Sequence, residues 1–347
     1  MIMKTIHKTN IALIVLFCVI SIVQIANSQV YPKYIFKHTD VNGYIGGLAF
    51  SHDHNKLITT GGQHAMMWDL NTGQKVMTFP PYSGYYAIDF SQDDKKIVTN
   101  HVDHATVAIW DAQTGDQIKT IQGEIDTRPP SWYTAVTFSR DGESVLCGDE
   151  NGSLYVIDIN QEKVIQKYKY LGGYMKNIQT FPDRVRVVAS SSIVSLQSGE
   201  IIRKFDSPIF LSYDGKNLFT FSVEDILGNW FFTTYVLDSN TYDKKNEYTP
   251  FLSNGTDHAI SPNGKFIACS GRTKADAIVK EMPRIIDLET NKTAQTFAVE
   301  GMPGDVFDMV KFSRDGNMVA FVKGDTVYLY DISGLAAGVK GAETMQP

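Results

Sequence analysis

The sequence predicts an all-β fold, a seven-bladed β-propeller. A phrase recurs along the chain: a hydrophobic strand, Phe-Ser-x-Asp-Gly, a second strand, and a third strand that ends in a large apolar residue and Asp. The central phrase is complete at 138–142 and 312–316, with weaker copies that begin at Phe50, Phe90 and Ile260. A period of ~40–45 residues built from short strands is typical of propellers, whereas helical repeats of that length need a 3.6-residue periodicity.

The ends of the third strands give the number of units. They are Trp68-Asp69, Trp110-Asp111, Ile157-Asp158, Leu237-Asp238, Ile286-Asp287 and Tyr330-Asp331, and Leu196-Gln197 fills the fourth place without the acid. Seven units then fit between about Val41 and Asp331. Because the fourth to sixth units are irregular, six or eight blades remain alternatives.

The last unit contains only three strands of its own, near 306–312, 318–322 and 326–331. The segment Tyr34–His38 precedes the first unit and resembles the outer strands of the other repeats. We expect it to pair with the 326–331 strand as the missing outer strand, because this closes the ring and covers an open sheet edge.

Three regions are expected along the chain: a signal peptide (1–28), the propeller (29–333) and a flexible Gly/Ala-rich tail (334–347). The first region has a basic start, an apolar run from Ile11 to Ile25, and small residues at Ala26 and Ser28. The run is shorter than the ~20 residues that a membrane-spanning helix needs. We therefore expect an exported protein that begins at Gln29 and is periplasmic, surface-bound or secreted, with no stable membrane insertion after cleavage. An uncleaved anchor is the alternative.

The charge of the mature chain disfavours two classes of partner. Removal of Lys4 and Lys8 leaves 32 − 2 = 30 basic residues against 38 acidic ones, a net charge of −8. Such a chain offers no basic field for nucleic acid or anionic lipid. Cys147 and Cys269 fall in distant repeats and apolar strands, so we expect buried free thiols.

From about Tyr31 to Ser333 the chain resembles the WD-repeat β-propeller family, in a divergent, exported, bacterial-type form. Trp68 and Trp110 retain the Trp-Asp pair, and His38 with Trp68 matches part of the family's buried polar network. Asp103 lies one residue from the usual spacing to Trp110. The resemblance implies protein binding, and a monomeric ring.

No catalytic site, metal site or cofactor is expected. The chain lacks a Gly-x-Ser-x-Gly elbow, a His-Glu-x-x-His motif, a Cys-x-x-Cys pair and a phosphate-binding Gly-Lys-Ser/Thr loop. The segment 101–104 (His-Val-Asp-His) is the nearest approach to a metal cluster, but a metal needs three or four converging ligands. The segment 52–54 (His-Asp-His) reads better as a solvated hairpin turn than as a ligand set.

Aromatic and charged residues before the first strands are the binding candidates. The predicted binding residues are Tyr44, Tyr86, Arg128, Trp132, Arg272 and Asp308. In the family, the positions of Tyr44, Tyr86, Trp132 and Asp308 approach the top surface and the mouth of the central channel. Pro129 and Pro130 stiffen the approach to Trp132, and Arg272 lies in a long connection, 271–284. For Tyr44, Tyr86 and Trp132, an equally good interpretation is that the side chains shield the contacts between blades from water.

The sequence thus predicts a non-enzymatic interaction scaffold that binds a protein partner through its top face and the loops of repeats three, five and six. Two alternatives remain. One is an envelope enzyme, a hydrolase or lyase, that uses the channel; it requires titratable side chains from several blades to converge on one pocket. The other is a carbohydrate or small-ligand site at the channel mouth.

Overall fold

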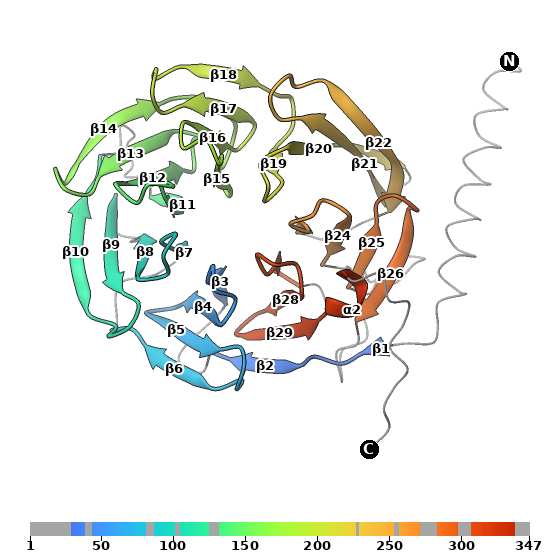
Figure 1. Cartoon of the computed structure of the whole chain (residues 1–347), viewed down its shortest axis with the longest axis horizontal. Coiled ribbons are helices and arrows are strands. Elements are labelled where there is room, and N and C mark those ends of the chain that lie inside the picture. Colours follow the sequence, from blue (N-terminus) through green and yellow to red (C-terminus); the bar gives the residue numbers. More distant parts are fainter. Residues whose placement is uncertain are drawn as a thin grey trace, which may run out of the picture.

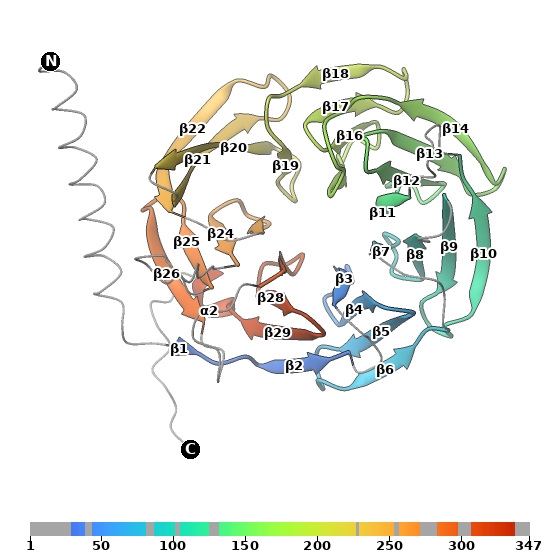
Figure 2. The ribbon, with the colours of Figure 1, turned by 180° about the vertical axis from the view of Figure 1, so that it is seen from behind.

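The computed structural model is a seven-bladed β-propeller, and it confirms the predicted fold class (Figure 1). It describes residues 29–38, 44–80, 87–100, 105–124, 132–226, 229–252, 257–270, 283–297 and 307–336. The blades follow one another around a central axis in chain order, as the reverse view also shows (Figure 2). The predicted binding residues Tyr86, Arg128 and Arg272 lie outside the described residues, as do the proposed signal peptide and the segment 101–104.

Each blade contains four antiparallel strands, of which the innermost lies nearest the axis. Blades 1 to 3 consist of β3 (Ile45–Phe50), β4 (Lys56–Gly61), β5 (His64–Asp69) and β6 (Lys75–Thr78); β7 (Ile88–Phe90), β8 (Lys96–Asn100), β9 (Thr106–Asp111) and β10 (Gln117–Gln122); and β11 (Tyr133–Phe138), β12 (Ser144–Asp149), β13 (Leu154–Asp158) and β14 (Lys163–Tyr168). Blades 4 and 5 consist of β15 (Ile178–Thr180), β16 (Arg186–Ala189), β17 (Ser192–Ser195) and β18 (Ile201–Lys204); and β19 (Ile209–Leu211), β20 (Asn217–Ile226), β21 (Asn229–Asp238) and β22 (Lys244–Leu252). Blades 6 and 7 contain β23 (His258–Ile260), β24 (Phe266–Cys269), β25 (Arg284–Asp287) and β26 (Lys292–Phe297); and β27 (Met309–Phe312), β28 (Met318–Lys323) and β29 (Thr326–Asp331).

The N-terminal segment closes the ring as predicted. Strand β2 (Tyr34–Lys37) pairs antiparallel with β29 and becomes the outer strand of blade 7. Its Phe36 is almost fully buried and stacks on Trp68 of blade 1, with ring centroids 4.9 Å apart. A second strand that the sequence did not predict, β1 (Gln29–Val30), runs parallel to β26 as a fifth strand of blade 6. The N-terminal chain therefore joins blades 6 and 7.

The repeated Ser-x-Asp-Gly phrase is the turn between the first and second strands. In blade 3 the Ser139 hydroxyl donates to Asp141 Oδ1 (2.5 Å) and accepts from the Ser144 amide (2.9 Å), and Asp141 Oδ1 also accepts from the Glu143 amide (3.0 Å). Two side chains thus satisfy the backbone of the turn, and Gly142 supplies the positive φ. Blade 5 contains the same turn at 212–215, a copy that sequence analysis missed.

Blade 4 corrects the predicted alignment of the third strands. Strand β17 ends at Ser195, and the Gly199 amide donates to the Ser195 carbonyl (3.0 Å), as the Gly73 amide does to Asp69 (2.8 Å). The Ser195 hydroxyl accepts from the Ser198 amide (3.0 Å), which is the bond that the acid accepts in blades 1, 2, 3, 5 and 6. Ser195, and not Gln197, therefore occupies the position of the missing acid.

Side chains between neighbouring blades form the core. Trp68 and Trp110 are buried, and their indole N–H groups donate to Thr59 and Thr99 (3.0 and 2.9 Å), so part of the family's polar network is present. Cys147 and Cys269 are buried, and neither forms a disulfide with another described residue, as expected. The expected tail begins with a helical turn, α2 (Ser333–Ala336), whose Leu335 packs against the core between blades 6 and 7. No described helix is long and apolar enough to span a membrane.

The outer strands of blades 1 to 6 carry a bulge at the same place. The register of each shifts by one residue near its start, which leaves one residue out of the ladder. The bulged residues are Val76, Ile118, Ile165, Ile202, Lys245 and Ala294. A bulge twists an exposed edge away from a flat template, so the open edges of blades 1 to 5 are protected against pairing with another chain, and β1 covers the edge of blade 6.

Candidate interaction face

We define the top face as the end of the propeller where the innermost strands begin. Tyr44 and Trp132 lie there, directly before β3 and β11, with 53% and 37% of their surface exposed. Both residues are therefore accessible. They belong to blades 1 and 3, so the structure does not bring them together in one small site.

Asp308, the third described candidate, has a structural contact. Its carboxylate accepts a hydrogen bond from the Gly324 amide (2.8 Å), and the Gly324 carbonyl accepts one from the Ile45 amide (2.7 Å). The side chain thus supports the turn between β28 and β29, next to the start of blade 1. This hydrogen bond gives Asp308 a structural role that needs no ligand.

The connection between blades 3 and 4, residues 169–177, carries two exposed aromatic side chains that sequence analysis missed. Tyr170 is 78% exposed and Tyr174 is 52% exposed, whereas Leu171 and Met175, the residues that directly follow them, are fully buried. The Thr134 hydroxyl donates to the Met175 carbonyl (2.6 Å), which joins this connection to the strand that follows Trp132. Trp132 and residues 169–177 form what we call the blade 3–4 platform.

The platform is held by many hydrogen bonds. The Leu171 amide donates to the Gly152 carbonyl (2.9 Å), and the Met175 amide donates to the Asp149 carbonyl (3.2 Å). The Leu171 carbonyl accepts from Ser192 of blade 4 (2.8 Å). The two exposed tyrosines thus stand on a backbone that is already ordered, which lowers the entropy cost of binding.

Gly152 shows how close the connection comes to blade 3. Its φ is +77°, and a Cβ atom at this position would collide with the Gly172 carbonyl oxygen. Any other residue there would strain the turn and push the platform away. The tight approach therefore requires glycine.

The platform is basic although the whole chain is acidic. Residues 169–177 contain two lysines and no carboxylate. Lys169 and Lys176 are exposed, and the Lys204 ammonium of β18 donates to the Tyr170 carbonyl (2.9 Å). Exposed aromatic side chains on an ordered backbone match the composition of protein-binding surfaces, which are enriched in Tyr and Trp.

Titratable residues around the axis join blades to one another. Arg314 of blade 7 bonds the Asp89 carboxylate of blade 2 (3.0 Å), and that carboxylate also accepts from Thr137 of blade 3 (2.5 Å). The Lys311 ammonium donates to the Leu48 carbonyl (2.7 Å). Asp257 accepts from the Val310 amide (2.9 Å).

Burial shifts the pKa of two of these residues, Lys311 and Asp257. It lowers the pKa of Lys311, a shift that Asp89 and Asp257 oppose, and it raises the pKa of Asp257 against the opposing effect of the Val310 hydrogen bond.

The segment 52–54 is not the solvated turn that we expected. The His52 ring bonds Asp94 of blade 2 (2.9 Å), and the same carboxylate accepts from the amides of His52 and Asp53 (both 2.8 Å). The His52 side chain is only 11% exposed, and burial, with the nearby Arg314, lowers its pKa. The segment is therefore a contact between blades 1 and 2. Within the described residues, no three His, Cys, Asp or Glu side chains gather as a metal site.

Comparison with protein-family models found no match. Two curated proteins resemble part of the chain. It is 28% identical over 119 residues to the pre-mRNA-splicing factor cwf17 of Schizosaccharomyces pombe, and 27% identical over 131 residues to a guanine nucleotide-binding protein subunit beta-like protein of Encephalitozoon cuniculi. These segments cover 34% and 37% of this chain and only 33% and 38% of the relatives, so the chain spans about a third of their length. Both relatives are of the WD-repeat type.

Among solved structures, a chain of the Kuenenia stuttgartiensis hydrazine synthase superimposes with a TM-score of 0.62. The match covers 86% of this chain and 98% of the other, at 13% sequence identity. At this level of identity the likeness shows the propeller fold alone.

Proposed function

We propose that this protein is an exported, non-enzymatic scaffold that binds a protein partner through the top face of the propeller, with the blade 3–4 platform as the central contact. The carrying observation is the pair of exposed tyrosines, Tyr170 and Tyr174, on a backbone anchored to blades 3 and 4. The partial likeness to two WD-repeat-type proteins supports a binding role.

The physical basis is area and pre-organisation. Tyrosine and tryptophan side chains bury a large surface on contact and lose little conformational freedom, so a few of them dominate the energy of an interface. The lysines around the platform add a charge that steers an acidic partner surface. Bonds between blades occupy the titratable residues described around the axis. This favours a binding role on the top face over a reaction centre at the axis.

The test compares two faces of the same molecule. Partners are captured in the native host by proximity labelling or cross-linking, with the wild type and with a Tyr170→Ala/Tyr174→Ala variant. Tyr213→Ala is the matched control, because Tyr213 is 49% exposed but lies in the first turn of blade 5, at the opposite face.

The proposal expects the double variant to weaken binding of the captured partner by about tenfold to a hundredfold, equal to about 1.4–3 kcal/mol, and the control to bind as the wild type does. Equal binding by the double variant and the wild type contradicts this use of the platform. Binding of glycans instead of protein, measured on a glycan array, contradicts the partner class.

A further inference from the structure

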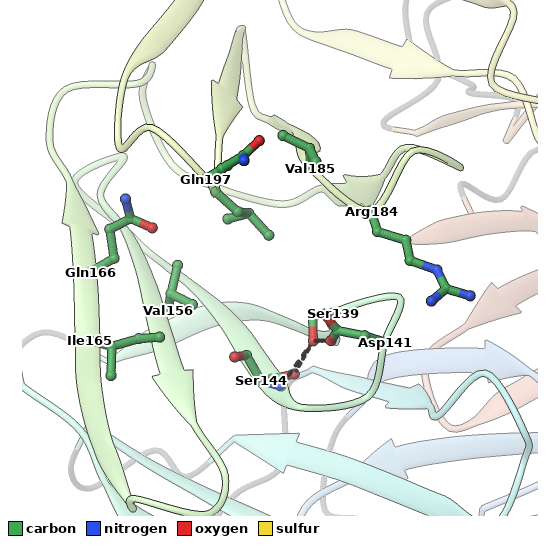
Figure 3. Close-up of a pocket in the computed structure, with 10 residues that line it drawn as sticks. Ser139, Asp141, Ser144, Val156, Ile165, Gln166, Arg184, Val185 and Gln197 are labelled. Carbon is green, nitrogen blue, oxygen red and sulfur yellow. Dashed lines mark hydrogen bonds between the residues drawn. The ribbon is translucent and has the colours of Figure 1, made fainter.

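A groove lies between blades 3 and 4 on the face opposite the platform (Figure 3). Its volume is about 330 Å³. Ser139, Asp141 and Ser144 of blade 3 line one side, and Val185, Leu196 and Gln197 of blade 4 line the other. Val156, Ile165 and Gln166 cover the outer end.

The groove is open because the side chain at position 144 is short. Residue 144 begins the second strand of its blade, and the corresponding position in blade 4 is Arg186. Hydrogen bonds establish this correspondence: the Ser139 amide donates to the Ser144 carbonyl (2.8 Å), as the Phe181 amide does to Arg186 (2.9 Å). In blade 1 the same position is Lys56, which pairs with Asp69. A serine fills none of this space.

Arg186 shows what occupies the next junction, between blades 4 and 5. Its guanidinium bonds the Asp183 carboxylate (2.5 Å), the Ser239 carbonyl (2.7 Å) and the Asn240 side-chain oxygen (2.9 Å). It also lies over the Phe181 ring, 4.2 Å from the centroid. One arginine thus bridges the first turn of its own blade and the third-strand turn of the following blade.

The groove presents counterparts of the Asp183 and Asn240 acceptors, and the residue in the place of Arg186 is Ser144. Asp141 corresponds to Asp183, since Oδ1 of each accepts from the amide two residues later (3.0 and 2.9 Å). Both Asp141 hydrogen bonds use Oδ1, so among the described residues Oδ2 has no partner. In the other wall, Leu196 and Gln197 take the places of Ser239 and Asn240, because the Gly199 and Tyr242 amides close equivalent turns.

We propose that this groove binds the arginine side chain of a basic segment in a protein partner. The guanidinium bonds Asp141 Oδ2 and the Gln197 side-chain oxygen, and its aliphatic stem lies along Val156 and Ile165. The net charge of −6 of the whole chain favours a basic partner. Arg184 lines the same groove, but its guanidinium points away from the other lining side chains (Figure 3). This site is independent of the platform on the top face.

The probe is a fluorescein-labelled pentapeptide with arginine between two leucines, titrated by fluorescence anisotropy against the protein from Gln29 to Pro347. The same peptide with citrulline is the neutral control of equal shape. Because a hydrogen bond to a charged group is worth more than a neutral one, the arginine peptide should bind at least about tenfold more tightly than the citrulline peptide.

Two variants locate the binding. Asp141→Asn removes the charge and keeps the turn, since Asn263 makes the same turn in blade 6 (Ser261 hydroxyl to Asn263 Oδ1, 2.7 Å). Ser144→Arg fills the groove from within, as Arg186 fills the next junction, and Ser144→Ala is its control. Loss of at least about tenfold in affinity for Asp141→Asn and for Ser144→Arg, with Ser144→Ala unchanged, supports the site.

Three results overturn it: no binding of the arginine peptide, equal binding of the citrulline peptide, or undiminished binding by Asp141→Asn. If Ser144→Arg fails to fold, Asp141→Asn and the citrulline peptide still decide. A platform variant, Tyr170→Ala/Tyr174→Ala, should bind the arginine peptide normally, so the two proposals can fail separately.

Discussion

Replacement of Phe36 by alanine tests how much the closing strand stabilises the ring. Phe36 is 1% exposed, stacks on Trp68 and belongs to the core between blades 7 and 1. An aromatic side chain buries roughly 150–250 Å², which at about 25 cal/mol per Å² corresponds to about 4–6 kcal/mol of transfer free energy. Alanine retains part of that surface, and measured Phe→Ala changes in cores cost about 3–5 kcal/mol.

The assay is urea unfolding of the mature chain, with the change in free energy of unfolding taken at constant slope. At about 2 °C per kcal/mol for a large domain, the melting temperature should fall by about 6–10 °C. Ile35→Ala is the matched control, because Ile35 is next to Phe36 on the same strand and is 59% exposed. This change should alter the free energy of unfolding by less than about 0.5 kcal/mol. If Phe36→Ala proves as stable as Ile35→Ala, the strand contributes no core to the ring and the reasoning fails.

Four further predictions follow from single features. Burial, with the nearby Arg284, lowers the pKa of His258 to about 4, below its ordinary value near 6.5. Between these two pH values the unfolded state binds a proton that the folded state does not. The free energy of unfolding should therefore fall as the pH drops from about 6.5 to about 4, and it should fall less steeply in His258→Gln. Trp132→Ala should weaken partner binding by about 1–3 kcal/mol at nearly constant stability, whereas a stability loss of about 3 kcal/mol with intact binding would make it a core residue. Intact-mass measurement of the exported protein should show a chain that starts at Gln29, and a full-length chain in the membrane fraction would contradict export by cleavage. Elemental analysis should find no stoichiometric metal, and a chelator should leave the melting temperature unchanged.

The fold was predictable because the repeated residues serve the backbone of each unit. Ser139 and Asp141 satisfy the amides of one turn, so the same two residue types recur wherever that turn recurs. The prediction of the closing strand succeeded for a related reason: blade 7 lacks an outer strand, and an open edge must be covered. The pattern misplaced blade 4 because a serine hydroxyl at Ser195 replaces the acid, which changes the residue type but keeps the hydrogen bond.

The sites were less predictable because they depend on contacts between blades. Tyr170 and Tyr174 have the same residue type as many buried tyrosines, and only the burial of Leu171 and Met175 shows which side faces water. The groove depends on the length of one side chain, Ser144, relative to its counterparts in other repeats. The groove could be found from the sequence by aligning the repeats on their first turns and comparing the residues at the position of Ser144.

The junctions near the axis explain why binding is better sought on the two faces. A different polar pair joins adjacent blades at each of the four junctions described near the axis: Asp257 with Val310, Lys311 with Leu48, His52 with Asp94, and Asp89 with Thr137. Removing one partner of such a pair leaves a buried polar group unsatisfied, which costs about 1–3 kcal/mol or more for a charge. A ligand at the axis would have to compete with these bonds and would lose that stabilisation. The platform and the groove pose no such conflict, because Tyr170 and Tyr174 are exposed and Asp141 Oδ2 has no hydrogen-bond partner among the described residues.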